Sequence, residues 1–532
     1  MGKNNQFIKT VGISTVIALS GANLVVAQDI SDRELGLTPE TIAQATDPSE
    51  DIIKPAQKPI DNTEKLNPSA NPLSFPTQTN EVEVEPEKPI SLEQAIELSL
   101  KNNQDVTEAR LQLERSGAAL REARAELYPT LDFTTGLNYG NAAFLDSSIE
   151  QNVESRAEDL VEQNPGLSQE QAISSVEQSF NNLDSATFTY NSTVNLGYDI
   201  FNGGRRGATI KANQKQLRSS ELELERIVEE TRFETARDYY NLQNSDALVK
   251  IEQAAVEDAR QTLKDAQLLE KAGLGTRFDV LRAEVELAQA QQRLSTATSN
   301  QNISRRQLAE TLNVSHDTDL STADAIEEAG TWELSLSESI VQAFKNRAEL
   351  EQLLLQREIA EENRTIALSR VRPTIGASAN YSLDNDFEDD NVDFNDRYQV
   401  GLNLQWTLFD GGAARASARQ SEIDAEVAET QFANQRNQIR FAVEQAYFSL
   451  EANQKNIGTA TKEVELARES LRLARLRFQA GVGTQTDVIE AQTQLTTARG
   501  NLLSSIIDFN QSYVDLQRQV SNNPDNGLQD LP

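Results

Sequence analysis

Phe201-Asn202-Gly203-Gly204 recurs further along the chain as Phe409-Asp410-Gly411-Gly412, at an offset of 208 residues. Each motif follows a run of alternating apolar and polar residues. Paired glycines permit a sharp turn, and Asn202 and Asp410 have side chains that can cap the first turn of a helix. The motif therefore predicts two strand-to-helix junctions in one chain.

An internal repeat extends outward from this motif. Matches at the offset of 208 residues run from Val194 past Val280, whereas earlier matches, such as Pro129 with Pro373, lie 244 residues apart. The first copy therefore has 36 additional residues, which fall within segment 141–187. Both prolines stop a helix where a strand begins. We expect repeat 1 over residues 89–315 (helix, two strands, two long helices), an inter-repeat connection over 316–333, and repeat 2 over 334–523 with the same order.

Each copy contains two runs with strict period-two alternation, so one face of each predicted strand is apolar and the other is polar. Strands of a soluble sandwich show the same alternation, but runs of about 10–12 residues are long enough to cross a bilayer at a tilt. The runs are Leu131–Tyr139 and Phe188–Ile200 in copy 1, and Ile375–Leu383 and Tyr398–Leu408 in copy 2.

The segments between paired strands are acidic. Segment 141–187 holds nine acids and one arginine, and segment 384–396 holds seven acids and no base, as expected of solvated extracellular loops. Four strands cannot close a membrane barrel, because the smallest such barrels have about eight. The chain must therefore oligomerise to bury the edges of its sheet. Two copies give eight strands and a filled interior, whereas three copies give twelve strands and a lumen.

Long helices are predicted after each motif. Between Gly204 and Glu270 there is one glycine and no proline. Such a run reaches about 100 Å as a helix. In the last helix of each copy, large apolar residues recur every seven positions and small residues lie three positions later, which is a coiled-coil pattern. In copy 2 the large residues are Val488, Leu495, Leu502, Phe509 and Leu516, and the small ones are Ala491, Ala498, Ser505 and Ser512.

The N-terminal region has the pattern of a secretory signal peptide over residues 1–27, with Lys3 and Lys9 before an apolar run and Val25-Val26-Ala27 before the cleavage site. Residues 28–88 hold 13 acidic and 5 basic side chains and most of the prolines, so we expect a disordered, proline-rich acidic spacer. We expect residues 524–532 to be a C-terminal tail.

The composition excludes several chemistries. The 532 residues include no cysteine and one histidine, His316, and the formal charge is −34. Disulfides and thiolate nucleophiles are therefore impossible, and a zinc or iron cluster is not expected. The acidic excess repels phosphate backbones, so we expect no nucleic-acid partner. No P-loop and no HExxH motif occurs, and we expect no enzyme, no catalytic residue, no metal and no cofactor.

In its order of elements, its Phe409–Gly412 motif and its segment Phe478–Val488, the sequence resembles the TolC-like outer-membrane efflux and secretion channels over residues 89–523. The resemblance implies an α+β membrane protein, a homotrimer whose twelve strands, four per chain, form one β-barrel in the outer-membrane lipid. A long α-helical coiled-coil barrel continues it across the periplasm. The implied function is export of small molecules or secreted polypeptides with a periplasmic adaptor and an inner-membrane transporter, ABC-type or proton-driven, in tripartite efflux or type I secretion.

The resemblance also carries candidate site residues. The turns that dock on the adaptor match Ala272-Gly273-Leu274 and Ala480-Gly481-Val482, where alanine replaces the valine of the family. The acidic constriction of the periplasmic entrance matches Asp487 and Glu490, whose i, i+3 spacing puts both on one helix face. A simpler interpretation is that acids in a first helical turn only favour the helix dipole, as we expect for Asp279.

One feature of the family is missing from the sequence. An arginine and a tyrosine that latch the closed entrance in some members correspond to Gly483 and Phe478 here, so that latch is absent. The alternative to a channel is a soluble periplasmic coiled-coil scaffold or adaptor protein, whose alternating segments form a small lipoyl-like or sandwich domain. The strand lengths, the aromatic apolar faces and the acidic loops favour the channel.

Overall fold

The computed structural model describes residues 57–68, 88–140, 146–180, 187–314, 318–386 and 394–521. All of them belong to one structural unit, residues 52–522. The expected signal peptide, the C-terminal tail, His316 and the middle of the acidic segment 384–396 lie outside the described residues.

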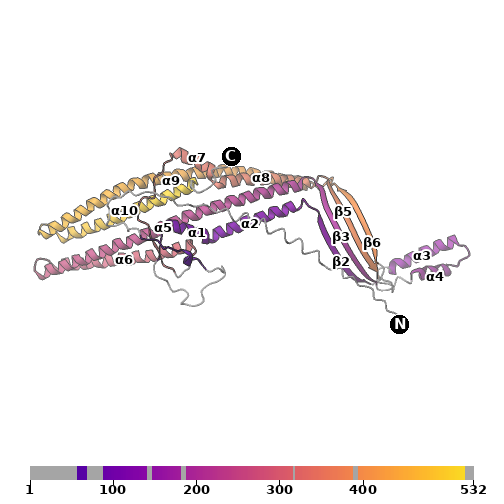
Figure 1. Ribbon diagram of the computed structural model, residues 1–532, viewed down its shortest axis with the longest axis horizontal. Coiled ribbons are helices and arrows are strands. Elements are labelled where there is room, and N and C mark those ends of the chain that lie inside the picture. Colours follow the sequence, from indigo (N-terminus) through magenta and orange to yellow (C-terminus); the bar gives the residue numbers. More distant parts are fainter. Residues whose placement is uncertain are drawn as a thin grey trace, which may run out of the picture. The chain divides into compact units, whose positions relative to one another are not determined.

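Long helices and a four-stranded sheet make up most of the unit (Figure 1). The helices are α1 (Leu92–Asn102), α2 (Gln104–Ala125), α3 (Asp146–Gln163), α4 (Gln169–Phe180), α5 (Arg205–Lys271), α6 (Arg277–Thr311), α7 (Leu336–Asn346), α8 (Ala348–Ser369), α9 (Ala413–Gln479) and α10 (Gln485–Val520), with a 3-10 turn at Glu64–Leu66. The strands are β1 (Lys88–Ile90), β2 (Thr130–Gly140), β3 (Thr187–Asn202), β4 (Leu320–Thr322), β5 (Thr374–Asp386) and β6 (Asn395–Gln405).

The element boundaries repeat along the chain. Helices α1 and α2 and strand β2 begin 244 residues before α7, α8 and β5, and α5 and α6 begin 208 residues before α9 and α10. The expectation of one helix before the first strand of each copy was wrong. Two helices precede that strand in each copy, because the helix is interrupted at Asn103 and at Arg347. The Asn103 side chain accepts hydrogen bonds from the N–H groups of Asp105 and Val106 and so starts α2 as a separate helix.

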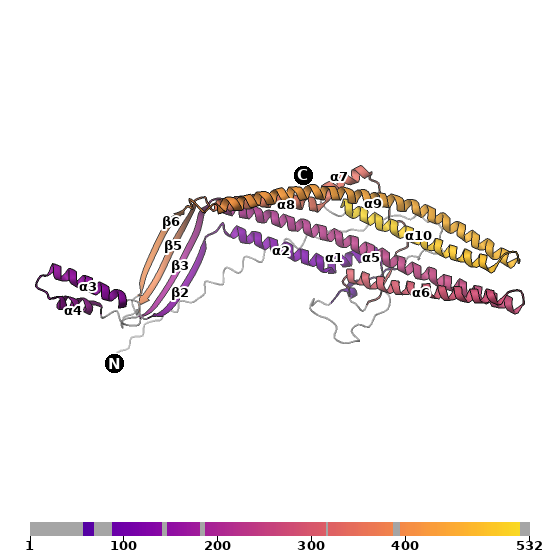
Figure 2. The same cartoon turned by 180° about the vertical axis from the view of Figure 1, so that it is seen from behind.

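The longest helices, α5 and α9, have 67 residues each. At 1.5 Å per residue each is about 100 Å long. Helix α6 packs along α5, and α10 packs along α9. Nearer the sheet, α2 lies beside α5, and α8 lies between α5 and α9 (Figures 1 and 2). The turns that join each helix pair lie at the end of the helices away from the sheet.

The seven-residue pattern of the last helix marks its buried side, as expected. Val488, Leu495 and Leu502 in α10 are buried, and so are the small residues Ala491 and Ala498 between them. Small residues between large ones let two helices approach closely. The seam of α10 against α9 is continuous with the main apolar core near the middle of the unit, which includes Phe509 and Leu516.

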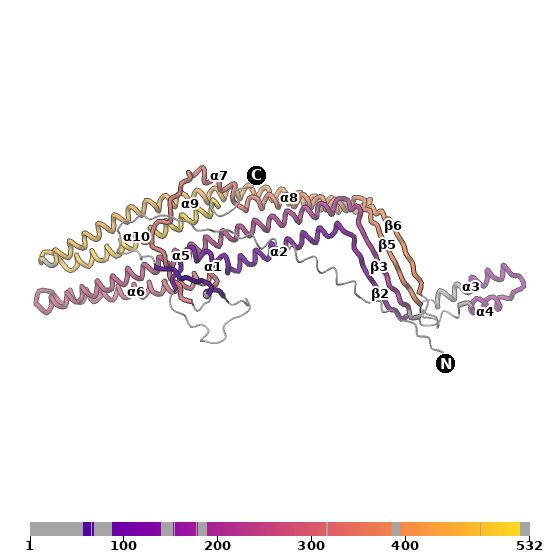
Figure 3. The backbone as a smooth tube through the Cα atoms, viewed as in Figure 1, coloured from indigo at the N-terminus to yellow at the C-terminus, as the bar shows by residue number. Residues whose placement is uncertain are grey.

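The four long strands form one antiparallel sheet in the order β2-β3-β5-β6 (Figure 3). In this register Phe133 lies opposite Val194, and Val194 lies opposite Tyr381, so apolar side chains share one face across neighbouring strands. Strands β3 and β5 are longer than expected, with 16 and 13 residues. Strand β6 ends at Gln405, so Trp406 and Leu408, which the alternation includes, lie beyond it.

The expectation of a disordered spacer over residues 28–88 was wrong for residues 57–68, which we call the strap. Leu66 of the strap is completely buried in the main apolar core. The backbone N–H of Gln57 donates to the Ala323 carbonyl at 2.6 Å, and that of Ile60 donates to the Pro89 carbonyl at 3.0 Å. A proline-rich acidic composition predicts disorder on average. Here the burial of Leu66 and the packing of Ile60 against the same core stabilise a short segment.

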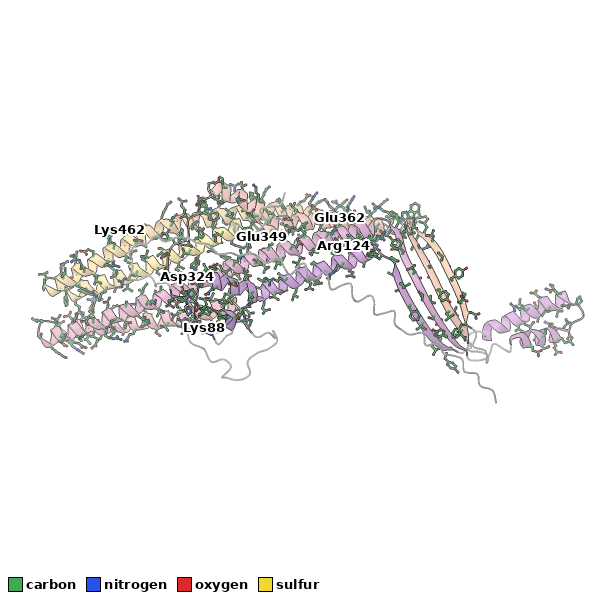
Figure 4. The ribbon with its side chains drawn as sticks, in the orientation of Figure 1. Lys88, Arg124, Asp324, Glu349, Glu362 and Lys462 are labelled. Atoms are coloured by element: carbon green, nitrogen blue, oxygen red, sulfur yellow. The ribbon has the colours of Figure 1, made fainter. Side chains whose placement is uncertain are left out.

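A small parallel sheet pairs β1, where the expected spacer meets repeat 1, with β4 in the expected connection. It packs on α5, where Tyr239 is completely buried. The Tyr239 hydroxyl donates to Asp324 Oδ2 at 2.7 Å, and the Leu92 N–H donates to the same oxygen at 2.7 Å. Figure 4 labels Asp324 and Lys88 in this middle part of the helices. These bonds tie the start of repeat 1 to the inter-repeat connection.

The additional residues of copy 1 include two helices, so the expectation that segment 141–187 is a loop was wrong. Helices α3 and α4 pack on each other through their own apolar cluster, which contains Val153, Ala157, Ala172 and Val176. Apolar residues at helical spacing occur in both segments, but the many acids around them favoured a loop.

Candidate functional site

The sheet presents an exposed apolar face, which is the first feature with a functional meaning. The side chain of Phe133 in β2 is 67% exposed and that of Tyr398 in β6 is 84% exposed. Leu131, Leu137, Val400, Leu402 and Leu404 on the same two strands are exposed as well. An apolar surface of this size on a single chain marks a contact with lipid or with another protein.

The sheet also has two open edges. Strands β2 and β6 are the outer strands of the four-stranded sheet, and each has one partner strand among the described residues. Open edges of eleven residues expose backbone N–H and C=O groups that need a partner. Both the face and the edges of the sheet are therefore incomplete in one chain.

The strand-to-helix junctions have the same backbone in both copies. Gly203 and Gly204 have φ values of +66° and +91°, and Gly411 and Gly412 have +71° and +91°. A Cβ on Gly203 would lie 2.8 Å from Arg372 Cβ, so this glycine is required by space as well as by conformation. After each pair of glycines the chain enters α5 or α9 directly.

Polar side chains hold these junctions. The Asn202 Oδ1 accepts a hydrogen bond from the Arg206 N–H at 3.2 Å. The Asp410 carboxylate accepts from the N–H groups of Gly412 and Ala414, at 2.9 and 2.7 Å. Pro129 and Pro373 lie directly before β2 and β5, after the ends of α2 and α8. Figure 4 labels Arg124 of α2 and Glu362 of α8 toward this end of the helices.

Aromatic side chains surround the junctions. Phe409 is 85% exposed, and Tyr128 and Trp406 are exposed too, with the exposed aliphatic Leu408 beside Phe409. The Trp406 Nε1–H donates to the Val371 carbonyl at 3.1 Å, so its polar edge is turned toward the helices. Aromatic residues in this position, between an apolar sheet and a polar body, are typical of the boundary between lipid and water.

The turns at the far end of the helices are a second matched pair. We call residues 272–275 and 480–483 the tip turns. Gly273 and Gly481 have φ values of +73° and +70°, and the N–H groups of Leu274 and Val482 donate back to Leu269 and Arg477. Leu274 is 79% exposed and Val482 is 70% exposed. Each tip turn thus presents one apolar side chain to solvent on a rigid backbone.

The candidate constriction acids lie one turn beyond the second tip turn. Asp487 and Glu490 are both exposed and belong to α10. Asp487 forms a capping box with Thr484, whose N–H donates to the Asp487 carboxylate at 2.9 Å. These hydrogen bonds hold the pKa of Asp487 below its ordinary value. Asp279 caps α6 in the same way with Thr276, so capping accounts for the local role of both aspartates.

Polar contacts link the two helix pairs near the tip turns. Arg282 of α6 donates to the Thr486 hydroxyl of α10 at 2.7 Å, and Arg475 of α9 forms an ion pair with Asp258 of α5 at 3.0 Å. The apolar clusters in this region stay within one pair, since Val256, Ala259 and Ala290 belong to α5 and α6 alone. Polar side chains therefore connect the two helix pairs near the tip turns.

The described residues contain neither a metal site nor a membrane-spanning helix. No cluster of three or more histidine, cysteine, aspartate or glutamate residues with the spacing of a metal site occurs among them. None of the described helices combines the length and the apolar character needed to cross a membrane.

Sequence reasoning located the junctions and the tip turns but missed some elements. The structure brings Asn202, Gly203 and Gly204 close to Arg372. The first tip turn is separated from this junction by the full length of α5. The link from Arg282 to Thr486 was missed, because the two residues lie in different copies of the repeat.

The chain is similar in sequence to outer-membrane proteins. The sequence model of the outer membrane efflux protein family matches residues 95–314 and 339–520. The outer membrane efflux protein BepC of Brucella suis is 27% identical over 191 residues, which are 36% of this chain and 41% of BepC. Nodulation protein T of Rhizobium leguminosarum bv. trifolii is 22% identical over 270 residues, 50% of this chain and 57% of that protein. The matched parts thus span less than two thirds of these relatives.

Solved structures share the fold at low identity. The outer membrane protein VceC from Vibrio cholerae superposes with a TM-score of 0.65 at 18% identity, covering 81% of this chain and 95% of VceC. CusC, whose crystal structures concern folding and transmembrane channel formation, superposes with a TM-score of 0.66 at 15% identity. The superposition covers 88% of this chain and 98% of CusC. With both copies of the repeat matched by the family model, the chain belongs to the outer membrane efflux protein family.

Proposed function

We propose that this protein is an export channel that carries its cargo across the periplasm and the outer membrane. As a member of the outer membrane efflux protein family, the chain is an outer-membrane protein. One observation carries the proposal. A sheet with an exposed apolar face and two open edges continues, through rigid glycine junctions, into helices of about 100 Å. That combination gives one molecule a lipid-facing part and a long polar part.

Three copies complete the sheet. If β6 of one chain pairs with β2 of the next, four strands per chain give a twelve-stranded β-barrel with no open edge. The apolar side chains of β2 and β6 then face lipid, and the alternate polar side chains line a lumen. The helices of the three chains close into a coiled-coil tunnel. Homotrimer formation is therefore part of the proposal.

The tip turns are the proposed docking surface for a periplasmic adaptor. Leu274 and Val482 are exposed apolar side chains at the turns, with Phe278 of α6 exposed nearby, and the backbone beneath each turn is fixed by hydrogen bonds. Rigid, exposed apolar anchors lose little entropy on binding. The adaptor connects the channel to an inner-membrane transporter, either ABC-type or proton-driven, which supplies the energy. Small molecules and secreted polypeptides are the proposed cargo.

Asp487 and Glu490 are the proposed constriction of the tunnel entrance. Their carboxylates are exposed and one helical turn apart. Three chains bring six of them together, and a ring of carboxylates selects cations. Capping by Asp487 does not compete with this role, because each carboxylate has two oxygens and several lone pairs.

The alternative is a soluble periplasmic scaffold or adaptor protein. A soluble scaffold has to cover the apolar face of its sheet, whereas Phe133 and Tyr398 are exposed. Among the described elements, strands β2 and β6 have their main contacts with the neighbouring strands β3 and β5. The channel therefore accounts for a surface that the scaffold leaves unexplained.

Membrane extraction and planar-bilayer recording test the proposal together. We expect the protein to require detergent for its release from outer membranes and the purified trimer to produce ion conductance. Release by salt or carbonate alone would support the scaffold. A protein that needs detergent for its release but gives no conductance would contradict the channel. This applies when the variant with Asp487→Asn and Glu490→Gln, which lacks the constriction carboxylates, gives no conductance either.

A further inference from the structure

The four helices next to the sheet form a row in the order α2-α5-α8-α9 (Figures 1 and 2). The repeat relates α5 to α9 at an offset of 208 residues, and α2 to α8 at an offset of 244. Helix α5 packs against both α2 and α8, whereas its equivalent α9 has only α8 beside it in the row. Helix α8 packs against both α5 and α9, whereas its equivalent α2 has only α5. Within the described part of the chain, each outer helix therefore lacks a neighbour that its equivalent has.

The strands show which neighbour is missing. Within the chain, β3 leads into α5 and α8 leads into β5, and where β3 pairs with β5, α5 packs on α8. In the same way β6 leads into α9, and α2 leads into β2. If β6 of one chain pairs with β2 of the next, α9 is brought against α2 of that next chain. The contact between α5 and α8 is thus a template for this second contact.

One ion pair of the template has apolar equivalents. Lys215 Nζ of α5 lies 3.1 Å from Glu362 Oε1 of α8, and both residues are half-buried (Figure 4 labels Glu362). The equivalent residues are Ile423 of α9 and Ala118 of α2, and both are exposed in the single chain. The lysine and the glutamate are replaced together, so the two positions still match each other.

A second pair has its two groups exchanged. The Gln352 amide of α8 donates to Glu223 Oε2 of α5 at 3.0 Å. The equivalent residues are Glu108 of α2 and Gln431 of α9, so the carboxylate and the amide have changed sides. Both are exposed in the single chain. An amide donor therefore still faces a carboxylate acceptor.

A third pair also changes on both sides. Arg218 Nε of α5 lies 3.0 Å from Glu351 Oε1 of α8. The equivalent residues are Glu426 of α9 and Thr107 of α2, both exposed. A threonine hydroxyl can donate to a carboxylate. None of the three equivalent pairs thus brings two like charges together.

The sheet supplies the same relation between its two open edges. Val194 of β3 pairs with Tyr381 of β5. The equivalent residues are Leu402 of β6 and Leu137 of β2, which are exposed apolar side chains. The register of β3 on β5, applied to the two edges, places these leucines opposite each other.

We propose that α9 of one copy packs along α2 of the next copy, in the register in which α5 packs along α8. Ile423 then lies beside Ala118 of the partner subunit, and the Gln431 amide donates to Glu108 of the partner subunit. Each exposed face covers the other, and three such contacts close the ring. The inference rests on the proposed homotrimer and names the helix surface through which its copies meet.

Cysteine cross-linking tests the contact, because the chain has no cysteine of its own. The full-length protein with Ile423→Cys and Ala118→Cys is treated in membranes with a short bismaleimide. We expect the protein to shift from monomers to covalent trimers on denaturing gels, since each chain is joined to both of its neighbours. Variants with only one of the two cysteines should stay monomeric.

Two further variants are matched controls. Lys215→Cys with Glu362→Cys joins α5 to α8 within one chain and should leave the monomer mass unchanged. Ile423→Cys with Thr107→Cys moves the second cysteine eleven residues along α2. That is about 16 Å along the helix, beyond the reach of the reagent. Trimers from this variant in equal yield would overturn the register.

The exchanged amide and carboxylate allow a second measurement. Gln431→Glu places two carboxylates opposite each other, which should raise the dissociation constant of the trimer in detergent by about 10-fold. Adding Glu108→Gln recreates between chains the pair that Gln352 and Glu223 form within one chain, and should restore the wild-type value. A double variant that dissociates as readily as Gln431→Glu alone would overturn the pairing.

Other outcomes separate this contact from the trimer itself. If light scattering finds a trimer in which the cysteines at positions 423 and 118 do not cross-link, the helix contact is overturned and the homotrimer stands. Covalent dimers as the end product of a complete reaction would indicate a two-fold pair and contradict both. A monomer by light scattering would contradict the homotrimer.

Discussion

The guanidinium of Arg282 in α6 donates a hydrogen bond to the Thr486 hydroxyl in α10 across 2.7 Å. This contact joins the first turns of one tip helix to the first turn of the other. Since the apolar clusters of α5 and α6 near the tips stay within that helix pair, polar contacts of this kind hold the pairs together there. These polar contacts lie near Phe478 and Gly483, the positions at which the sequence lacks the arginine and tyrosine latch.

We predict that Arg282→Gln opens the entrance. A hydrogen bond from a charged donor contributes about 1.5–3 kcal/mol, so its loss should raise the open probability by about 10-fold or more. Single-channel recording in planar bilayers measures this. Arg260→Gln is the control, because Arg260 pairs with Glu257 of its own helix. An unchanged open probability in Arg282→Gln would show that this hydrogen bond does not hold the entrance closed.

Cation preference should depend on Asp487 and Glu490. The double variant with Asp487→Asn and Glu490→Gln should move the reversal potential in a salt gradient toward zero, because the carboxylates that attract cations are gone. Asp279→Asn removes the equivalent cap of α6 and should leave the reversal potential unchanged. An unaltered selectivity in the double variant would remove the constriction assignment and leave the channel in place.

The pH dependence of the Asp487 cap follows from its pKa. The hydrogen bonds from Thr484 hold the folded-state pKa below the ordinary value of 3.8. A group with a depressed folded-state pKa contributes stability above its unfolded pKa and loses it as the pH falls through the folded pKa. The cap should therefore be intact at neutral pH and lost only below about pH 4. Hydrogen exchange of the Thr484 amide against pH checks this, and loss of protection already near pH 6 would contradict it.

Removal of the Tyr239 hydroxyl should destabilise the middle of the protein. Burial raises the pKa of Tyr239 far above its ordinary value, so the phenol stays protonated and donates to Asp324. Tyr239→Phe leaves that carboxylate short of a donor, at a cost of about 1–3 kcal/mol. Chemical denaturation in detergent measures the loss. Tyr128→Phe, at an exposed position, is the control and should have no effect.

The strap should contribute to stability through one side chain. Leu66 is completely buried, and Leu66→Ala should cost about 2–5 kcal/mol through lost burial and a residual cavity. The control is Leu274→Ala at the exposed tip turn. A melting temperature equal to that of the wild-type protein would mean that the strap does not hold its place in the folded protein.

The long elements could be predicted from the sequence for a physical reason. Their signals are periodic and repeat over many residues, as in the seam from Val488 to Leu516, and a doubled motif supports each element a second time. The junctions could be predicted because Gly203 and Gly411 lie in a conformation that few other residues adopt.

The remaining elements depend on contacts between distant parts of the chain. The strap is held by Leu66 in a core built from both repeats, and β1 pairs with β4, which lies far along the chain. No local pattern of a few residues specifies such a partner.

The equal length of α5 and α9 constrains how this protein can change. Deleting one residue from α9 alone would retract its end by about 1.5 Å and rotate everything beyond by about 100°, so that Val482 would point in another direction. The two helices must therefore keep the same length. Insertions and deletions in these helices are therefore tolerable only when they are made in both copies together.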